Sequence, residues 1–479
     1  MTARFTLDEV AIAAAARVDR EGPFGLRAPI DGIFTDSRKP APGALFVALA
    51  GENHDGAAFA ESAARAGAAG VLVAHKQAAR IASVFAEARL PSAVLSCTDP
   101  GRALLGLARA WRGRMPTLRL VAITGSAGKT STKELVASVL SAEGSTLKTE
   151  GNLNNEIGVP LTLLQLAREH RFAAIECGMN HLGEIARLCA AADPDVALVT
   201  NVAPVHLEGC GSIDGVAHAK GELFHGLRAN GVAIANADDA RVLGQAKLSM
   251  RKLITFGTAE GADVRLLSVR HAGAGLEVEL VLRGKQELAQ LSLIGLHNGV
   301  NAAAAAAAGL ALGIRSDVIL RGLALARTPG RRMRPTKLAS GALLLDDCYN
   351  ANPASMRAAF DTVATLRRDG GRALLVLGDM LELGPTELEL HRDVGQAAAA
   401  ISPSLLLCFG TRARAYADGA RAAGLSDSAI VLAETPEAAL GALQSRLGAA
   451  DLVLVKGSRG MKMERISDPL AGVAEAGAH

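Results

Sequence analysis

Paired cysteines and an excess of charge of either sign are missing from this sequence of 479 residues. Its six cysteines form no Cys-x-x-Cys pair, which argues against a disulfide framework and against a structural zinc site. The formal net charge is only +3, so electrostatics give no reason to expect a nucleic-acid or membrane partner. These absences indicate a globular protein with reduced, mostly buried thiols.

Long apolar runs are also absent. The alanine-rich stretch NAAAAAAAGLALGI is too short and too weakly apolar to cross a bilayer. The N-terminal stretch MTARFTLDEVAIAAAARVDR carries acidic residues and has no long apolar core after a basic start, so we expect no signal peptide. We therefore expect a soluble, cytoplasmic protein that does not insert into a membrane.

The length exceeds that of one ordinary domain, and the pattern predicts three α/β domains. Strand-like apolar runs alternate with helix-like stretches almost throughout, which favours parallel α/β units. We expect domains over residues 1–97, 98–327 and 328–479, with the Pro-, Gly- and Arg-rich segment RTPGRRMRP as the second linker. The last section has four strand-like runs in the order of a Rossmann-like, doubly wound sheet.

The stretch ITGSAGKTSTKE, residues 123–134, predicts a phosphate-binding loop between a strand and a helix. Backbone N–H groups and the helix N-terminus would face phosphate oxygens, Lys129 would neutralise them, and Thr130 would face Mg²⁺. The spacing departs from Walker A, because Ile123 stands where that motif has its first glycine. A Gly-rich turn with an exposed lysine is the alternative.

Two further polar residues follow predicted strands. Glu176 ends the run RFAAIE, and His206 comes six residues after the run VALVT. The carboxyl ends of strands in a doubly wound sheet gather at the ligand crevice, so both side chains can approach the phosphate loop. The alternative for each is a structural polar group.

Several longer strings resemble the Mur ligases. They are TGSAGKTSTKE, TEGNLNNEIGVPLTLL, ECGMNHLGEI, TNVAPVHLEGCGSIDGVAHAKGELF and HNGVNAAAA, in that order. The later strings DDCYNANPASM, LGDMLELG and VKGSRGMKME resemble those members that add D-alanyl-D-alanine. The resemblance runs from about residue 30 to about residue 465.

The resemblance implies an ATP-dependent amide-bond ligase. Residues 1–97 would bind the UDP-muramoyl peptide, residues 98–327 would form a P-loop ATPase-like centre, and residues 328–479 would bind D-Ala-D-Ala. The product would be UDP-N-acetylmuramoyl-pentapeptide, formed from the tripeptide through an acyl phosphate during peptidoglycan precursor synthesis. We expect a monomer whose partners are these small molecules and ATP.

The resemblance also implies roles for individual residues. Catalytic roles fall to Lys129, Glu176, His206, Lys220 and Arg331. Two Mg²⁺ ions would be held by Thr130, Glu176, His206 and Lys220, the last of these as a carbamate. ATP would contact Gly125, Ser126, Ala127, Gly128, Lys129, Thr130, Ser131, His297, Asn298, Asn301, Arg331 and Asp347.

The two other substrates have their own expected contacts. Ser37, Arg38, Asn154 and Asn155 would contact the UDP-linked substrate, and Asn350, Asn352 and Lys456 would contact D-Ala-D-Ala.

Alternatives stay open at several of these positions. Arg332 competes with Arg331 for the phosphates, and Lys220 could be an ordinary surface lysine. The asparagines of HNGVNA could cap a helix, Lys456 could be an exposed loop lysine, and Ser37 and Arg38 could form a polar turn.

Other functions remain in competition. A P-loop ATPase acting as a switch would explain residues 120–330 but would leave DDCYNANPASM unexplained. The diamino-acid-adding ligase and folylpolyglutamate synthetase are nearer alternatives, against which the same string argues. The sequence does not identify the diamino acid at the third position of the peptide.

Overall fold

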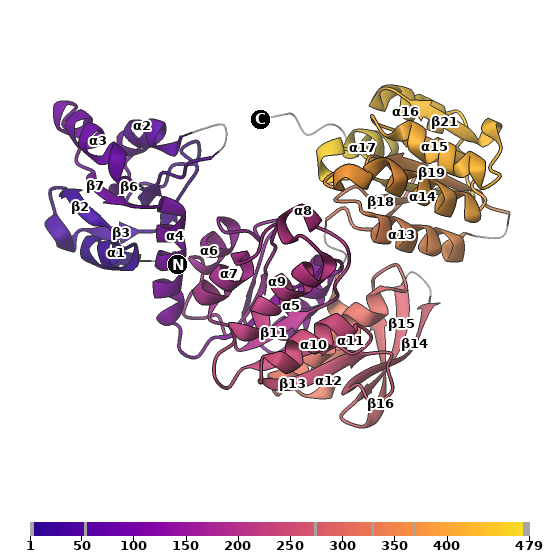
Figure 1. Cartoon of the computed structure of the whole chain (residues 1–479), viewed down its shortest axis with the longest axis horizontal. Coiled ribbons are helices and arrows are strands. Elements are labelled where there is room, and N and C mark those ends of the chain that lie inside the picture. Colours follow the sequence, from indigo (N-terminus) through magenta and orange to yellow (C-terminus); the bar gives the residue numbers. More distant parts are fainter. Residues whose placement is uncertain (1–3, 52–54, 273–274, 328–329, 368–369, 473–479) are drawn as a thin grey trace.

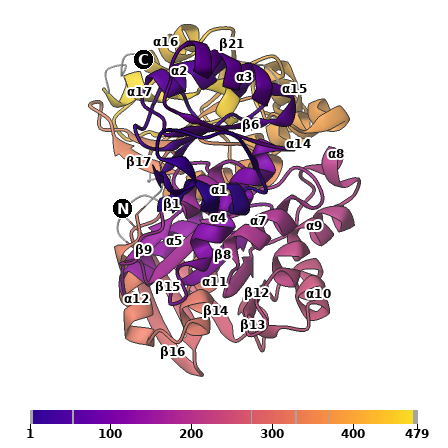
Figure 2. The same cartoon turned by 90° about the vertical axis from the view of Figure 1, so that its left-hand side faces the viewer.

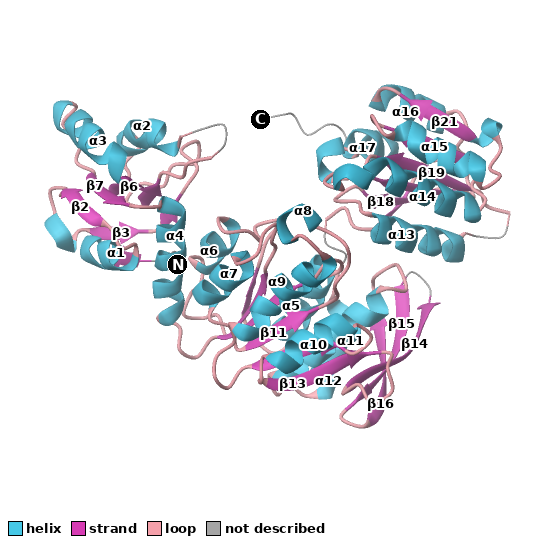
Figure 3. Ribbon diagram, viewed as in Figure 1, coloured by secondary structure: helices cyan, strands magenta, loops and turns pink. Residues whose placement is uncertain are grey.

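Three α/β lobes follow one another along the chain in the computed structural model, which describes residues 4–51, 55–272, 275–327, 330–367 and 370–472 (Figure 1). The first lobe lies on one side of the central lobe and the third lobe lies on the other. Helices cover the sheets of all three lobes (Figure 3). The predicted three-domain α/β fold is confirmed, whereas the limits at residues 97/98 and 327/328 stay a prediction.

The first lobe is built on a sheet with the strand order β2-β7-β6-β5-β4. Only β2 is antiparallel to its neighbour in this sheet, and β1 pairs with β3 outside it, among the described residues. The elements are β1 (Arg4–Thr6), α1 (Leu7–Ala13), β2 (Arg17–Arg20), β3 (Pro29–Asp31), β4 (Ile33–Phe34), β5 (Leu45–Val47), α2 (Ala60–Arg65), β6 (Gly70–Ala74), α3 (His75–Glu87) and β7 (Ala93–Cys97).

The central lobe carries the sheet β16-β15-β14-β13-β12-β11-β8-β10-β9. Successive residues of β8 enter opposite cores: Leu120 packs with the helices of one face and Val121 with those of the other. This two-sided burial explains the unbroken apolar run of a parallel strand. The strands are β8 (Arg119–Thr124), β9 (Thr146–Lys148), β10 (Phe172–Glu176), β11 (Val196–Val199), β12 (Val232–Asn236) and β13 (Lys252–Gly257).

Helices cover both faces of this sheet (Figure 2). On one face lie α6 (Gly158–Leu163), α7 (Glu184–Ala192), α9 (Ile213–His225) and α10 (Ala240–Leu248). On the other lie α5 (Lys129–Ser141), α11 (Asn298–Ala311) and α12 (Ser316–Leu325). The short helix α8 (Leu207–Cys210) stands at the edge of the lobe that faces the third lobe (Figures 1 and 2).

The predicted alternation of strands and helices does not extend to the far end of this sheet. There β14 (Val264–Ala272), β15 (Gly275–Leu282) and β16 (Lys285–Leu291) are antiparallel. Two residues with positive φ, Arg283 and Gly284, connect β15 to β16, and so short a connection allows only a hairpin. The signal was in the sequence, because GLEVELVL alternates apolar and acidic residues with the period of a half-buried strand.

The third lobe has the strand order β17-β18-β22-β19-β20-β21 and helices on both faces, so the predicted doubly wound sheet is confirmed. Its strands are β17 (Arg334–Lys337), β18 (Leu343–Asp347), β19 (Ala373–Gly378), β20 (Leu405–Phe409), β21 (Ile430–Ala433) and β22 (Leu452–Lys456). One face is covered by α13 (Pro353–Leu366), α14 (Glu387–Ala400) and α15 (Ala413–Ala422), and the other by α16 (Pro436–Gln444) and α17 (Glu464–Ala471).

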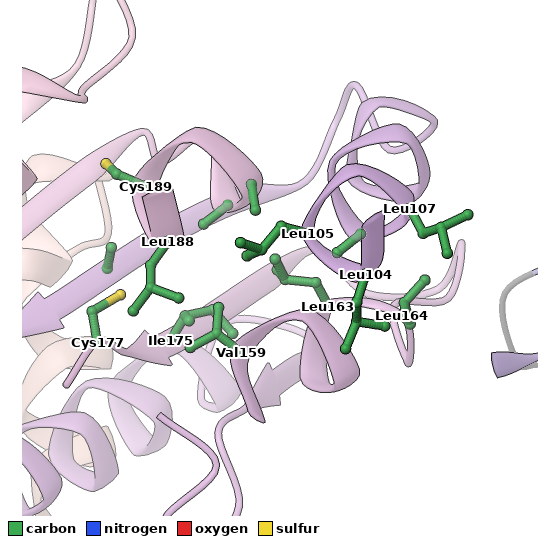
Figure 4. Packing of buried hydrophobic residues seen from close by; sticks show 14 of the residues in the cluster. Leu104, Leu105, Leu107, Val159, Leu163, Leu164, Ile175, Cys177, Leu188 and Cys189 are labelled. Atoms are coloured by element: carbon green, nitrogen blue, oxygen red, sulfur yellow. The ribbon is translucent and has the colours of Figure 1, made fainter. Parts of the chain in front are cut away.

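Helix α4 (Pro100–Gly113) joins the first lobe to the central lobe. Asp99 caps it, accepting hydrogen bonds from the N–H groups of Gly101 and Arg102, and Pro100 stands at its first position. A Cβ at Gly106 would lie 2.2 Å from the carbonyl oxygen of Ala13, so α4 meets α1 backbone to backbone. Figure 4 shows the leucines of α4 packed with those of α6 and α7 in one continuous core.

Among the described residues, no helix combines the length and the apolar character that a membrane crossing requires.

Helix α5, which begins at the predicted phosphate loop, packs closely on α12. A Cβ at Gly322 would lie 2.4 Å from the Cα of Val139. We expect Gly322→Ala to push the two helices apart and to cost about 1–3 kcal/mol of stability, measured by thermal unfolding. Gly244→Ala is the control: it has open space on α10 and should be neutral or gain up to about 1 kcal/mol. Equal melting temperatures for the two variants would contradict this account of the packing.

Candidate functional site

The predicted phosphate loop lies between β8 and α5, and its glycines are required by its shape. Gly125 has φ +151° and Gly128 has φ +78°. A Cβ on Gly125 would lie 1.8 Å from Thr200 Oγ1, and a Cβ on Gly128 would lie 2.8 Å from Asn301 Oδ1. Both positions therefore exclude a side chain, because the backbone passes too close to its neighbours.

The segment after β11 holds this loop in place. The N–H of Ser126 donates to the carbonyl of Asn201 over 2.9 Å, and the N–H of Ala127 donates to Asn201 Oδ1 over 2.9 Å. Thr200 Oγ1 donates to the carbonyl of Ala127 over 2.6 Å. Asn201 and Thr200 were not among the predicted site residues, although their position at the end of the predicted strand VALVT was a usable signal.

The first turn of α5 follows directly on this loop, with Gly128 as its N-cap. Its leading N–H groups have no carbonyl within the helix to accept them, as at any helix start, and they suit an anion. Lys129 Nζ donates to the carbonyl of Gly125 over 2.8 Å, so the lysine folds back over the loop. Burial, together with the positive charge of Arg332, lowers the pKa of Lys129. A phosphate group at the loop would relieve both effects.

Glu176 ends β10 beside β8 and is almost fully buried. Its Oε1 accepts a hydrogen bond of 2.7 Å from Asn154 Nδ2, whereas its buried Oε2 has no hydrogen-bond partner within the described part of the chain. A buried carboxylate oxygen without a partner is costly unless something else contacts it. This oxygen is a candidate ligand for a cation.

A buried lysine, Lys220, and a half-buried histidine, His206, lie in the same region. Lys220 lies on α9 and is 2% exposed, and its pKa is well below the usual value because of burial and the nearby charge of Lys129. Burial and the charges of Lys220 and Lys129 lower the pKa of His206 to about 4. His206 is therefore neutral near pH 7, and the lowered pKa of Lys220 favours its neutral amine more than in a solvent-exposed lysine. This burial rules out the alternative that Lys220 is an ordinary surface lysine.

The two linker arginines point in different directions. Arg332 Nη2 donates to Thr130 Oγ1 over 3.0 Å, and its guanidinium lies 4.0 Å from the centre of the Tyr349 ring. Arg331 instead pairs with Asp346 at 2.8 Å and Asp468 at 2.7 Å, both in the third lobe. Of the two alternatives, this structure brings Arg332 to the loop, and the phosphate contact of Arg331 stays a prediction.

In the third lobe, Asp347 and Lys456 form a buried ion pair of 2.6 Å at the carboxyl ends of adjacent strands. Lys456 Nζ also donates to the carbonyl of Asn350 over 3.0 Å, so Lys456 is not an exposed loop residue. Asn352 caps α13, with its Oδ1 accepting from the N–H of Ser355. The contact of Asn352 with a dipeptide stays a prediction. The Oδ1 atom that caps the helix is already occupied by the N–H of Ser355.

The side chains of the two asparagines in HNGVNA are bonded to one another and to their neighbours within the protein. Asn301 accepts from Thr132 Oγ1 over 3.1 Å and donates to Asn298 Oδ1 over 2.9 Å. Asn298 in turn donates to the carbonyl of Ile294 over 2.8 Å. His297, one residue before α11, is exposed. A small cavity next to this chain is lined by Ser131, Glu134, Leu135, Leu293, Ile294, Asn298, Arg327 and Arg332.

The residues predicted to contact a UDP group lie in two lobes. Arg38 is exposed and pairs with Asp36, and Ser37 stands between them in a polar turn. Asn155 Oδ1 accepts from the N–H groups of Ile157 and Gly158 at the start of α6. Asn154, bound to Glu176, is therefore the predicted UDP-substrate residue that the structure brings next to the phosphate loop.

No cluster of three or more His, Cys, Asp and Glu side chains suited to a metal occurs among the residues that the structure describes. A cation at the loop would thus depend on the mixed set of Thr130, Glu176, His206 and Lys220.

Comparisons with family models match the three lobes separately. Residues 29–108 match the Mur ligase family catalytic domain, residues 123–309 match the Mur ligase middle domain, and residues 331–459 match the Mur ligase glutamate ligase domain.

Individual relatives match over nearly the whole chain. The UDP-N-acetylmuramoyl-tripeptide–D-alanyl-D-alanine ligase of Escherichia coli is 41% identical, over 91% of this chain and 93% of that protein. MurF from Acinetobacter baumannii has a TM-score of 0.86 at 31% identity, covering 98% of this chain and 99% of that one. MurF from Thermotoga maritima in complex with ADP has a TM-score of 0.79 at 26% identity, covering 92% and 97%.

The close approach of Gly125 to Thr200 can be tested directly. We expect Gly125→Ala to weaken ATP binding at least about tenfold, since the methyl group would displace the loop from β11. Binding of a fluorescent ATP analogue and the circular dichroism melting curve would both be measured. The control is Gly151→Ala, which shares a positive φ of +55° but has open space around it. Unchanged ATP affinity in Gly125→Ala would show that the contact does not shape the site.

Proposed function

The chain belongs to the Mur ligase family, and from this premise we propose that it joins D-alanyl-D-alanine to UDP-N-acetylmuramoyl-tripeptide at the expense of ATP. The relatives' names supply the substrates, and the site supplies the chemistry. The observation that carries the proposal is the meeting of two lobes at one loop, where Arg332 from the linker to the third lobe bonds Thr130. Such a site can hold ATP between two other substrates.

A carboxylate is a poor electrophile, so the reaction needs activation. The terminal carboxylate oxygen of the tripeptide would attack the γ-phosphorus of ATP, and ADP would leave. The amine of D-Ala-D-Ala would then attack the acyl carbon, and phosphate would leave with the transferred oxygen. Lys129, the start of α5 and Arg332 would hold and neutralise the phosphoryl oxygens through both steps.

Mg²⁺ fits the oxygen atoms at this site. The unpartnered Glu176 Oε2 and the Thr130 hydroxyl are hard ligands of the kind that this ion prefers, and neutral His206 can complete the set. When bound, Mg²⁺ supplies charge neutralisation at the phosphates. We propose two ions, as the resemblance implies.

Lys220 fits a carbamate. Its pKa is lowered and it has no salt bridge to a carboxylate among the described residues, so its amine is free to react with CO₂. Carbamylation would replace the amine of Lys220, whose protonated form is repelled by Lys129, with an anion. The charge of Lys129 is near enough to lower the pKa of Lys220, so it would attract that anion. This exchange would remove a repulsion between two like charges.

The acceptor would lie at the carboxyl ends of the third lobe's strands. Asp347 and Lys456 are buried there next to Asn350, and the ion pair between them offers one group of each sign to a dipeptide zwitterion. Adenine would enter the cavity that Asn298 and Ile294 line. We propose a monomer acting in the cytoplasm.

A coupled assay tests the reaction. We expect the purified protein with ATP, Mg²⁺ and UDP-N-acetylmuramoyl-tripeptide to release phosphate only after D-Ala-D-Ala is added. Tripeptide labelled with ¹⁸O in its terminal carboxylate should pass one label into that phosphate. Release without the dipeptide would indicate an ATPase, and release with a free diamino acid and the dipeptide-stage nucleotide would indicate another ligase of the family.

The carbamate has a separate test. Lys220→Ala should lower kcat at least about 100-fold, and a short carboxylate such as formate should restore part of it by occupying the vacated space. The control is Lys133→Ala, because Lys133 is equally buried but bonds Glu134 and the carbonyl of Thr149. Formate should not rescue it. Full activity of unrescued Lys220→Ala would remove this lysine from the mechanism.

A further inference from the structure

The linker after Gly330 is hydrogen-bonded to the end of β18 and to the turn that follows it. The N–H of Met333 donates to Asp347 Oδ1 over 3.1 Å, and the N–H of Tyr349 donates to the carbonyl of Arg331 over 3.2 Å. Arg334 pairs with Asp346 both in the β17–β18 ladder and through an ion pair of 2.9 Å. From Arg331 onward, the linker is therefore part of the third lobe.

Arg331 is the most strongly anchored residue of this linker. Its Nη1 donates to Asp346 Oδ2 over 2.8 Å and to Ser467 Oγ over 3.2 Å, and its Nη2 donates to Asp468 Oδ2 over 2.7 Å. Asp346 is fully buried, so this carboxylate depends on its arginine partners. Two charge-assisted bonds from one planar guanidinium leave it little freedom to turn toward another anion.

Arg332 has the opposite surroundings. Within the described residues it forms no salt bridge with a carboxylate, and it is held by the face of Tyr349 and by Thr130. The two neighbouring arginines lie in a bend before β17, between Gly330 and Met333, which both have positive φ, and their side chains bond partners in different lobes. Fixing Arg331 on the α17 side therefore presents Arg332 on the side of the phosphate loop.

We infer that Arg331 is a positioning residue, which acts on the nucleotide only by holding Arg332 in place through the carboxylates of Asp346 and Asp468. This inference deepens the proposed function and rests on it for the identity of the reaction. It assigns the phosphate contact to Arg332 alone and gives α17, far from the loop in sequence, a part in nucleotide turnover.

A double-mutant cycle tests the inference. Arg331→Gln and Asp468→Asn would each be made in the native protein and in an Arg332→Ala background. We expect each to lower kcat/KM for ATP about tenfold in the native protein and less than about twofold in the Arg332→Ala background, because the group they position is then gone. Asp468→Asn keeps the side chain's shape and leaves Asp346 paired, so it guards against misfolding of the Arg331 variant.

The opposite results are distinct. If Arg331 itself binds the phosphates, its tenfold loss will persist in the Arg332→Ala background. If its role is only to stabilise the third lobe, the melting temperature will fall and the losses will again multiply. Either result, or native activity in Asp468→Asn, would overturn the inference. Arg465→Gln is the control, since it removes the exposed α17 pair with Glu437 and should change neither quantity.

The affinity for a non-hydrolysable ATP analogue would be measured on the same variants by calorimetry. We expect the same non-additive pattern in Kd, and additive losses there would overturn the inference. This readout needs no second substrate. A native protein that binds the analogue but never forms amide would refute the proposed function, while the cycle in Kd would still decide the role of Arg331.

Discussion

The approach of Gly125 to Thr200 sets the geometry of the whole site. Because the loop after β8 touches the segment after β11 backbone to side chain, the two strands and the start of α5 form one rigid edge. Glu176 enters this edge from β10, which pairs with β8 on the other side. Strand β8 therefore lies between β11, which leads to the anchor of the loop, and β10, which carries the candidate cation ligand Glu176.

Among the residues that the structure describes, buried charges divide into groups that have an oppositely charged partner within the protein and groups that have none. Asp347 and Lys456 neutralise each other, and Asp346 is neutralised by two arginines, so these charges are compensated without a ligand. Glu176 Oε2 and Lys220 have no such partners in the described chain, yet burial makes their isolation costly. The free-energy cost of burying an unpaired group is acceptable where a bound ligand compensates it, and both of these groups lie near the phosphate loop.

Local pattern was enough to predict the strands that position the site, since buried parallel strands read as unbroken apolar runs. It was also enough to place Gly125, Gly128 and Glu176 at the carboxyl ends of neighbouring strands, while their roles toward ATP and a cation stay predictions. It could not separate Arg331 from Arg332, because their partners Asp468 and Thr130 are more than a hundred residues away in sequence. The antiparallel end of the central sheet was missed for a different reason. The period-two pattern of GLEVELVL indicates a half-buried strand, but the general alternation of strands and helices was extended over it.

Positive charge gathers at the loop beyond what the chain as a whole would suggest. With a net charge of only +3, the protein still gathers positive groups there: burial and the charge of Arg332 lower the pKa of Lys129, and burial and the charge of Lys129 lower the pKa of Lys220. Like charges in a partly buried crevice destabilise the folded protein unless an anion joins them. A triphosphate reverses the sign of each of these interactions at once, so its binding energy includes the repulsion that it relieves. Because Arg332 belongs to the third lobe, part of that energy would act between lobes and would favour arrangements in which Arg332 stays at the loop.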